Sequence, residues 1–212
     1  MALPIKAMVG IGGKPVQVSF HEGGHTYETA TGVIIPSVTQ LMKVLTDKAY
    51  GMINRDTLRA AAEFGTAVHA CTEYYDLDDL DEDSVLDEWK PCMDAYKSFV
   101  ADHQPKYIAI EQRLACEQWA GTIDRIGTIG DDLWIIDLKT TSAIHGFAGV
   151  QLAGYTLLWL INHPEENRPI RRAVLQLRKD GSYRFKEFTD PMDFSCFSAL
   201  LTLHKWEINH GE

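Results

Sequence analysis

The fold is decided by two neighbouring segments, Gly121-Thr122-Ile123-Asp124-Arg125-Ile126-Gly127 and Trp134-Ile135-Ile136-Asp137-Leu138-Lys139-Thr140. Gly130 and Asp131 lie between them and suit a tight turn, so the segments are predicted to pair as an antiparallel hairpin. With those two residues as the loop, Asp124 lies directly opposite Asp137, and the Cβ atoms of such a pair are about 5 Å apart. Because side chains alternate along a strand, Lys139 shares the face of Asp137. Two carboxylates and one amine are therefore expected at one end of the hairpin.

The remaining positions of the hairpin are mostly apolar on both faces. The face of the two acids continues with Ile126, Leu133 and Ile135, and the opposite face carries Ile123, Ile129, Trp134, Ile136 and Leu138. A sheet that is apolar on both faces is covered on both sides. The hairpin is therefore predicted to be central and buried.

Capping residues, glycines and apolar periodicity divide the rest of the sequence into helices and strands. Before the hairpin they predict a smaller hairpin over 16–30, a helix from the N-cap Ser37 to 46, a helix over 56–75, an acidic loop over 76–83, a helix from the N-cap Ser84 to 103, and a strand over 107–116. The hairpin strands are predicted over 119–128 and 133–139. A helix over 147–161, strands over 171–178 and 183–188, and a last helix opened by Asp190 and Pro191 follow.

This order of elements predicts a mixed α/β (α+β) fold, with a central mixed β-sheet flanked by helices. The chain of 212 residues is long enough for one domain, and no repeat or Pro/Ser-rich linker divides it. We expect a single unit over 1–212, with an N-terminal hairpin and helices over 1–55 and the core over 56–212.

Composition excludes several classes of protein. With 45% hydrophobic and 24% charged residues, the chain is expected to fold as a soluble globule. Its most apolar segment, over 147–161, is shorter than the roughly 20 residues that a membrane span needs. The four cysteines are scattered and no secretory signal begins the sequence, so we expect reduced thiols and a cytoplasmic protein.

The net charge of −10 does not exclude a nucleic-acid partner, because the excess acid is concentrated. Ten acidic residues and no Lys or Arg lie between 60 and 89, and the rest of the chain is neutral. Seven basic residues lie between 168 and 186. They fit either a nucleic-acid-binding surface or a solvated pair of strands. The basic residues expected to contact DNA are Arg171, Arg172, Arg178, Lys179 and Arg184.

The opposed acids of the hairpin need compensation, because buried like charges repel each other. Lys139 supplies part of it. A divalent cation supplies more, since Mg²⁺ is held by one or two carboxylates and keeps water and phosphate oxygens as its other ligands. Such a cation acidifies a bound water and neutralises charge on a phosphodiester. The same residues also fit a structural Asp–Lys–Asp cluster without catalysis, and both interpretations remain open.

Four other residues are candidates for the same site, each with an ordinary structural alternative. His69 falls on the less apolar side of the predicted 56–75 helix, as a metal ligand or a surface residue. Gln151 and Tyr155 are one helical turn apart and reach either the site or only each other. Glu111 interrupts an apolar strand and points either to the site or to solvent.

Taken in order, these motifs resemble a known family. They are Gly65-Thr66-x-x-His69, Glu111, Gly121-x-x-Asp124, Asp137-x-Lys139-Thr140 and Gln151-x-x-x-Tyr155. This set is similar to that of the RecB-like nucleases of the PD-(D/E)XK superfamily, a group that includes phage exonucleases and the mitochondrial genome maintenance exonuclease. The resemblance covers 36–155.

The resemblance implies a restriction-endonuclease-like αβββαβ core that cleaves DNA with Mg²⁺, for which Mn²⁺ substitutes. His69, Asp124, Asp137 and the Leu138 carbonyl would bind the metal, and Lys139 would position the attacking water. Glu111 would be a further acidic residue of the site, with Gln151 and Tyr155 orienting the lysine or the DNA.

The resemblance also implies partners and a setting. We expect an exonuclease of phage recombination or DNA processing that acts on single- or double-stranded DNA with an end, with a recombination or single-strand-binding protein as a partner and no role for a membrane. The alternative is a DNA-binding or assembly module of the same fold without turnover. The polarity of cleavage, an endonuclease and an RNA substrate are left open.

Overall fold

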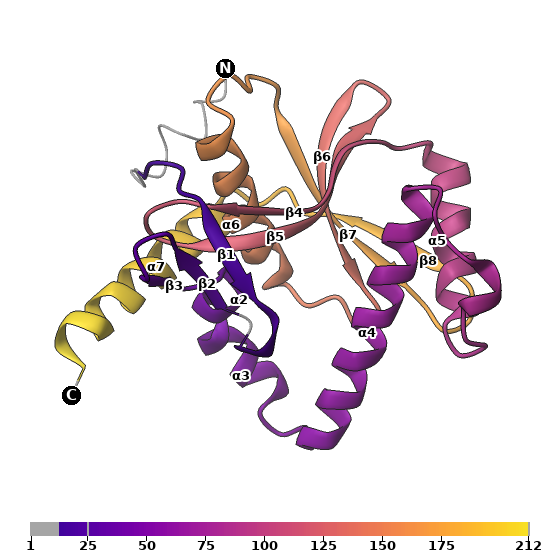
Figure 1. Cartoon of the computed structure of the whole chain (residues 1–212), viewed down its shortest axis with the longest axis horizontal. Coiled ribbons are helices and arrows are strands. Elements are labelled where there is room, and N and C mark those ends of the chain that lie inside the picture. Colours follow the sequence, from indigo (N-terminus) through magenta and orange to yellow (C-terminus); the bar gives the residue numbers. More distant parts are fainter. Residues whose placement is uncertain (1–12, 25, 212) are drawn as a thin grey trace.

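The computed structural model describes residues 13–24 and 26–211, and its centre is a five-stranded sheet (Figure 1). The strands are β4 (Lys106–Ala115), β5 (Ala120–Ile129), β6 (Asp132–Lys139), β7 (Ile170–Leu177) and β8 (Tyr183–Glu187), and they lie side by side in that order. Neighbours are antiparallel except β6 and β7, which are parallel and joined by a helix. The predicted mixed α+β fold with a central mixed sheet is confirmed.

The β5–β6 hairpin has the predicted register. Ile129 pairs with Asp132 and Arg125 with Ile136, so Gly130 and Asp131 form the turn. Gly130 has a φ of 59°, in the left-handed region where glycine is favoured. The ladder ends at Arg125. Beyond it, the backbone N–H of Leu138 donates to Asp124 Oδ2 at 2.7 Å, so a side chain continues the pairing of the strands.

The predicted alternation of faces is wrong at Ile123. This residue packs in the same core cluster as Ile126, although three positions along a regular strand lead to the opposite face. The next residue, Asp124, also departs from a regular ladder, because its carboxylate accepts the Leu138 amide of β6. The remaining apolar residues of β6 alternate as predicted, with Leu133 and Ile135 on one face and Trp134, Ile136 and Leu138 on the other.

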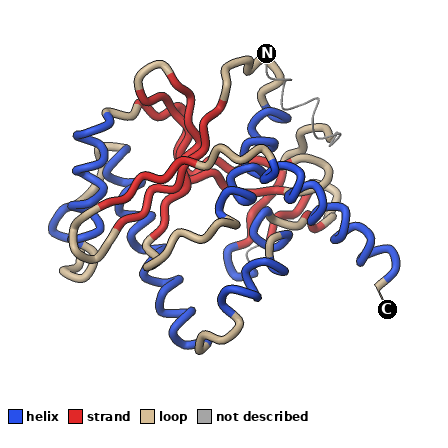
Figure 2. Tube along the Cα trace, turned by 180° about the vertical axis from the view of Figure 1, so that it is seen from behind, coloured by secondary structure: helices blue, strands red, loops and turns tan. Residues whose placement is uncertain are grey.

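Helices cover both faces of the sheet, as the two apolar faces require (Figure 2). One layer consists of α6 (Ala148–Asn162) and α7 (Met192–His210), with α2 (Val38–Leu41) beside them; the other consists of α4 (Arg55–Asp76) and α5 (Lys90–His103). The helix α6 is buried at every position from Ala148 to Leu160. Its length and setting agree with the prediction of a core helix, and none of the described helices is long and apolar enough to cross a membrane.

A small N-terminal sheet packs against one end of β4 and β5. Its strands are β1 (Val18–His21), β2 (Thr26–Thr29) and β3 (Ile34–Ile35), and the turn is η1 (Glu22–Gly24). Tyr27 and Ile35 join a core cluster with Ala115 and Ala120. The predicted hairpin is confirmed, although His25, predicted to open its second strand, lies outside the described residues. The division at residue 55 stays a prediction.

Two predicted helices differ from the structure. Ser37 is the expected N-cap and forms a capping box with Gln40, but the helix breaks at Met42 and continues as α3 (Lys43–Tyr50). Ser84 caps nothing, because it belongs to the short turn η2 (Glu82–Ser84). The helix predicted there begins only at Lys90, with Pro91 in its first turn. Proline lacks the N–H that a longer helix would require at this position, which fixes the start.

Candidate active site

A cleft of about 770 Å³ lies at the end of the sheet where β6 ends. Its walls come from α4, the strands β4 to β6, α6 and the N-terminal sheet. All eight residues predicted to act in catalysis or metal binding line it: His69, Glu111, Asp124, Asp137, Leu138, Lys139, Gln151 and Tyr155. The motifs that are scattered over the sequence therefore meet at one place in the structure.

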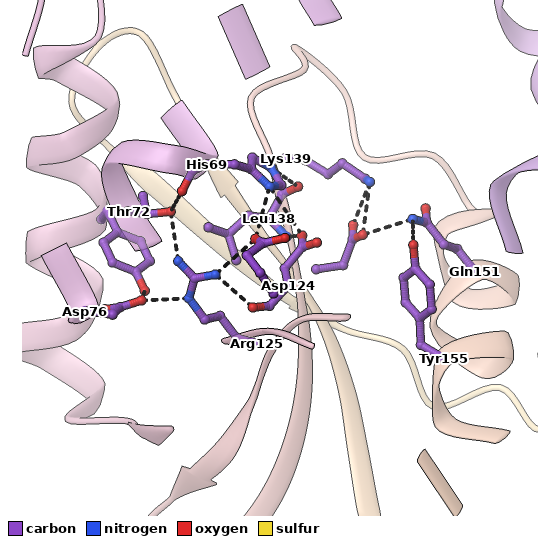
Figure 3. Close-up of polar contacts among 12 residues, drawn as sticks. His69, Thr72, Asp76, Asp124, Arg125, Leu138, Lys139, Gln151 and Tyr155 are labelled. Atoms are coloured by element: carbon purple, nitrogen blue, oxygen red, sulfur yellow. Dashed lines mark hydrogen bonds and ion pairs between the residues drawn. The ribbon is translucent and has the colours of Figure 1, made fainter. Parts of the chain in front are cut away.

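Three of these residues form a group that can hold a cation. His69 Nδ1 lies 3.8 Å from Asp124 Oδ2 (Figure 3). It also lies 3.8 Å from Glu111 Oε1, and one ligand atom from each of the three residues lies within 4.8 Å of the others. Ligands around a metal at about 2.1 Å are separated by about 3–4 Å, so these three atoms need to move little to share an ion. The donor set of two carboxylates and one imidazole suits a divalent cation.

His69 is oriented for this task by the backbone of β6. Its Nε2 donates to the Leu138 carbonyl at 3.1 Å, so Nδ1 faces the two carboxylates. Burial of the ring opposes its positive charge, but Asp124 and Glu111 outweigh burial and raise the pKa of His69. Burial also raises the pKa of Asp124, an effect that His69 and Lys139 reduce. A buried acid that is expensive to ionise needs a cation nearby.

Asp137 and Lys139 form the second part of the site. Lys139 Nζ lies 3.0 Å from Asp137 Oδ1 and 2.9 Å from Oδ2, and Gln151 Nε2 donates to Oδ1 at 3.0 Å. Burial raises the pKa of Asp137 to about 6, although Lys139 counteracts it. Among the described residues, Asp137 Oδ2 has the Lys139 ammonium as an ion-pair partner and accepts no well-directed hydrogen bond. A carboxylate oxygen with this one partner keeps a second lone pair that can bind a cation.

The helix α6 supports this acid–lysine pair from below. Gln151 Nε2 also donates to Tyr155 Oη at 3.1 Å, so the predicted pair is an internal hydrogen bond that leads into the site. The glycine of the Gly121-x-x-Asp124 motif has a steric reason, because a Cβ at Gly121 would lie 2.9 Å from a carbon of the Tyr155 ring. That glycine lets α6 approach β5 closely enough for this contact.

The geometry differs from the expected ligand set in two respects. The two acids predicted to oppose each other have different partners, because Asp124 Oδ2 accepts the Leu138 amide while Asp137 bonds to Lys139; besides burial, the charge of Asp124 still raises the pKa of Asp137. The Leu138 carbonyl, expected to bind metal, accepts the His69 hydrogen bond. Glu111, for which the sequence left both the site and solvent open, faces the site and belongs to the three-residue group.

Glu111 reaches the site through an unusual backbone conformation, with a φ of 46° in the left-handed region. A residue with a side chain loses about 1–2 kcal/mol there, and strain of this kind is concentrated at functional sites. The neighbours Ile110 and Gln112 pair with β5 in register, so the deviation is confined to Glu111.

This strain gives a testable prediction for Glu111→Gly and Glu111→Ala. Both variants lose the carboxylate, but glycine adopts a positive φ without the clash. Relief of the strain favours glycine by about 1–2 kcal/mol, and the larger loss of conformational entropy on folding disfavours it by about 0.5–1 kcal/mol. We therefore expect the glycine variant to be more stable than the alanine variant by about 0.5–1 kcal/mol. Urea unfolding measures the difference. At Gln112, which is in regular strand, the alanine variant should instead be more stable than the glycine variant. A glycine variant that is the more stable at both positions, or at neither, would contradict the prediction.

The basic residues expected to contact DNA fall into two groups. Because β6 and β7 are parallel and Lys139 pairs with Gln176, the residues after β7 lie at the end of the sheet that carries the cleft. Arg178 and Lys179 are exposed there. Arg184, on β8, is the register partner of Gln176 on β7 and is exposed at the same end. Arg171 is at the other end of β7, where its guanidinium pairs with Glu187 and Asp132.

The prediction for Arg172 is wrong. Its side chain is buried and its guanidinium bonds to Asp193 at 3.0 Å, to the Gly149 carbonyl at 3.0 Å and to the Asp190 carbonyl at 2.9 Å. It therefore fastens α7 to α6 and does not reach solvent. Arginines that alternate in a basic strand point to opposite faces, and one of those faces is the core.

Sequence reasoning missed two arginines. Arg113 is exposed in β4, lines the cleft and lies over the Phe20 ring of β1 at 4.9 Å. Nothing in the sequence shows that the N-terminal sheet meets β4 there. Arg125 is fully buried beneath the site. The sequence did indicate a role for it, because a charged residue in a strand that is apolar on both faces needs a buried partner.

Comparison with known families agrees with this site. A model of the PD-(D/E)XK nuclease superfamily matches residues 86–201, which include Glu111, Asp124, Asp137 and Lys139. No curated protein matches the chain. Nucleases of this superfamily use divalent metal ions, which the group of His69, Glu111 and Asp124 is suited to hold. The matched segment spans more than half of the chain and includes the central sheet with α5 and α6, and the chain therefore belongs to the PD-(D/E)XK nuclease superfamily.

Proposed function

We propose that this chain is a divalent-metal-dependent deoxyribonuclease that hydrolyses phosphodiester bonds in the cleft at the end of β6. The observation that carries the proposal is the convergence of ligand atoms of His69, Glu111 and Asp124 within 4.8 Å of one another, beside the ion pair of the buried Asp137 with Lys139. Mg²⁺ is the expected cation, with Mn²⁺ as a substitute, because the oxygen-rich ligand set suits hard ions.

The residues divide the work according to their contacts. A divalent cation, when bound, would acidify a water and neutralise charge on the scissile phosphate. His69, Glu111 and Asp124 would hold it, and Asp137 Oδ2, which pairs with Lys139, would add a ligand through its second lone pair. Lys139, whose pKa is raised by Asp137 and Asp124 against the effect of burial, keeps its charge and would orient the attacking water and stabilise the transition state.

Gln151 and Tyr155 act at one remove from the reaction. Gln151 donates to Asp137 and to Tyr155 Oη, so we assign the pair the role of holding the Asp137 carboxylate in the position that orients Lys139. A residue with this role affects the rate through geometry, because small displacements of a reacting group are costly.

The experiment that tests the proposal uses the purified chain on end-labelled linear single- and double-stranded DNA and on closed circles. Each substrate is incubated with Mg²⁺, Mn²⁺ or EDTA. We expect cleavage with either metal and none with EDTA. Binding without cleavage would favour the alternative of a DNA-binding module, and equal cleavage in EDTA would refute the metal mechanism. A parallel RNA substrate tests the choice of nucleic acid.

The finer assignment also belongs to this proposal. The ordered motifs support the RecB-like branch and an exonuclease of phage recombination or DNA processing in the cytoplasm, working with a recombination or single-strand-binding protein. An exonuclease degrades the linear substrates from their ends and leaves closed circles intact. Cleaved circles would instead indicate an endonuclease.

We further propose that Arg113 contacts the DNA backbone together with Arg178, Lys179 and Arg184. Arg113→Ala is expected to weaken DNA binding about 3- to 10-fold and to reduce the salt dependence of binding by about one phosphate contact. Binding is measured at several salt concentrations in EDTA. Arg168→Ala is the matched control, because Arg168 is an exposed arginine paired with Glu166 before the other end of β7. Equal losses in the two variants would show only a general charge effect.

A further inference from the structure

Arg125 is a buried cation immediately behind the metal-binding group. Its side chain has an exposed fraction of 0%. The guanidinium donates to Asp76 Oδ2 at 2.6 Å, to Thr72 Oγ1 at 3.0 Å and to the Asp124 carbonyl at 2.8 Å (Figure 3). It also donates to Glu111 Oε1 at 3.2 Å. Because no solvent reaches it, Arg125 cannot touch DNA, and the role that we assigned to other basic residues does not apply.

These contacts connect the three elements that carry the proposed ligands. Glu111 is on β4 and Asp124 is on β5, and Arg125 bonds to the carboxylate of Glu111 and to the backbone carbonyl of Asp124. Thr72 is on α4 one turn after His69, and its hydroxyl donates to the His69 carbonyl at 2.8 Å. One planar guanidinium with several donors therefore spans α4, β4 and β5 at the level of the ligands, a geometry that lysine cannot reproduce.

The charge of Arg125 is balanced from the side away from the site. Asp76 accepts from its Nε, and Tyr96 Oη donates to the same Asp76 oxygen at 2.5 Å. Arg125 in turn offsets the negative charge of Glu111. The half-buried Glu111 and the buried Asp124 would otherwise repel each other before a cation binds.

Glu111 depends most on this contact. Its left-handed backbone is strained, and such a conformation persists only when neighbours hold it. The Oε1 atom that faces His69 Nδ1 at 3.8 Å is the same oxygen that accepts from Arg125 at 3.2 Å. Arg125 therefore fixes the oxygen of Glu111 that points to the cation position.

We propose that Arg125 is a positioning residue that preassembles the metal site from behind and limits Glu111 to a single ligand oxygen. The proposal rests on the metal site of the proposed function. One fixed oxygen suits Mg²⁺ and Mn²⁺, which take small octahedral ligand sets, whereas Ca²⁺ readily accepts bidentate carboxylates. Arg125 thus favours the smaller ions over Ca²⁺.

The experiment measures Mn²⁺ and Ca²⁺ binding directly, by calorimetry and by the electron paramagnetic resonance spectrum of bound Mn²⁺. Arg125→Lys keeps the positive charge but removes the planar guanidinium with its several N–H donors. Arg125→Met combined with Asp76→Asn removes the buried pair with no change of net charge and leaves an acceptor for Tyr96, which guards against unfolding. In both we expect Mn²⁺ affinity to fall at least 10-fold, Ca²⁺ affinity to fall less, and the Mn²⁺ spectrum to change.

A mutant cycle with Glu111→Gln separates positioning from a general structural role. If Arg125 acts through Glu111, the loss of Mn²⁺ affinity in the combined variant is smaller than the product of the separate losses. Arg171→Lys is the matched control, since Arg171 also bridges two acids at the opposite end of the sheet, and it should leave Mn²⁺ binding unchanged.

The outcomes distinguish this inference from the proposed function. Folded Arg125 variants that keep wild-type Mn²⁺ affinity and selectivity, or independent losses in the cycle with Glu111→Gln, would overturn the positioning role and leave the nuclease proposal standing. Absence of Mn²⁺ binding by the unaltered chain would overturn the metal site itself, and with it the proposed function.

Discussion

Asp124→Asn is expected to lower the cleavage rate at least 1000-fold while the protein remains folded. The substitution keeps the shape of the side chain, and its amide oxygen still accepts the Leu138 N–H that Asp124 Oδ2 accepts at 2.7 Å. What it removes is the negative charge in the centre of the ligand group. Loss of the cation removes water activation and charge neutralisation together, which amounts to about 4 kcal/mol or more of transition-state stabilisation.

The stability of the variant should separate this loss from unfolding. Burial raises the pKa of Asp124, so the folded chain without metal disfavours its ionised form. A neutral isostere avoids that cost, and we expect the melting temperature without metal to be at least that of the unaltered chain. Mn²⁺ should raise the melting temperature of the unaltered chain only, because a ligand stabilises the state that binds it.

Asp131→Asn provides the control for Asp124→Asn. Asp131 is an exposed aspartate in the turn of the same hairpin, so the same chemical change is made outside the cleft. Cleavage should be unaffected there. Activity of Asp124→Asn within 10-fold of the unaltered chain would contradict the assignment of Asp124 as a ligand.

Much of the fold was predictable because local signals agreed with each other. The turn at Gly130 and the apolar faces of both strands point to a single register, and the structure has that register. The start of α5 was mispredicted because Ser84 is an acceptable cap in isolation, and the proline that fixes the start lies seven residues later. A capping residue indicates where a helix is allowed to begin, whereas proline limits where it can.

The site was predictable in membership but less so in geometry. The ordered motifs predicted eight residues, from His69 to Tyr155, that all line the cleft, although other residues such as Arg113 line it too. They could not show that Asp124 turns to the β6 amide or that Glu111 adopts a positive φ, because both depend on contacts between strands. The prediction that Arg172 contacts DNA was wrong for a related reason, because the basic residues of β7 do not reveal which face of the strand α6 and α7 cover.

Metal binding is expected to weaken steeply as the pH falls from 7.5 to 5.5. Cations bind deprotonated ligands, so each proton held at the site competes with the metal. The pKa of Asp137 is raised by burial to about 6, and the pKa of His69 is raised by Asp124 and Glu111 against the effect of burial. Both shifts move proton competition toward neutral pH.

The size of the effect follows from the number of protons released. Below its pKa, one competing group weakens binding about 10-fold per pH unit, and two groups titrating together up to about 100-fold. We therefore expect the dissociation constant for Mn²⁺ to rise at least about 10-fold between pH 7.5 and 5.5. Calorimetry in buffers of different ionisation enthalpy counts the protons, and Asp137→Asn should release fewer than the unaltered chain. A constant affinity with no proton release would contradict the prediction.

The fold without metal should respond to pH in the opposite sense through Asp137. Its pKa in the folded chain, about 6, is above the ordinary value of 3.8, so the folded state binds this proton more tightly than the unfolded state. The stabilisation from this group is present below about pH 4 and is lost as the pH rises through 6. Acid thus favours the metal-free fold at this residue while it releases the cation. With Mn²⁺ present, the stabilisation of the fold by the metal should increase with pH over the same range in which the contribution of Asp137 is lost. Asp137→Asn should reduce both the loss of metal-free stability and the gain in stabilisation by Mn²⁺ as the pH rises.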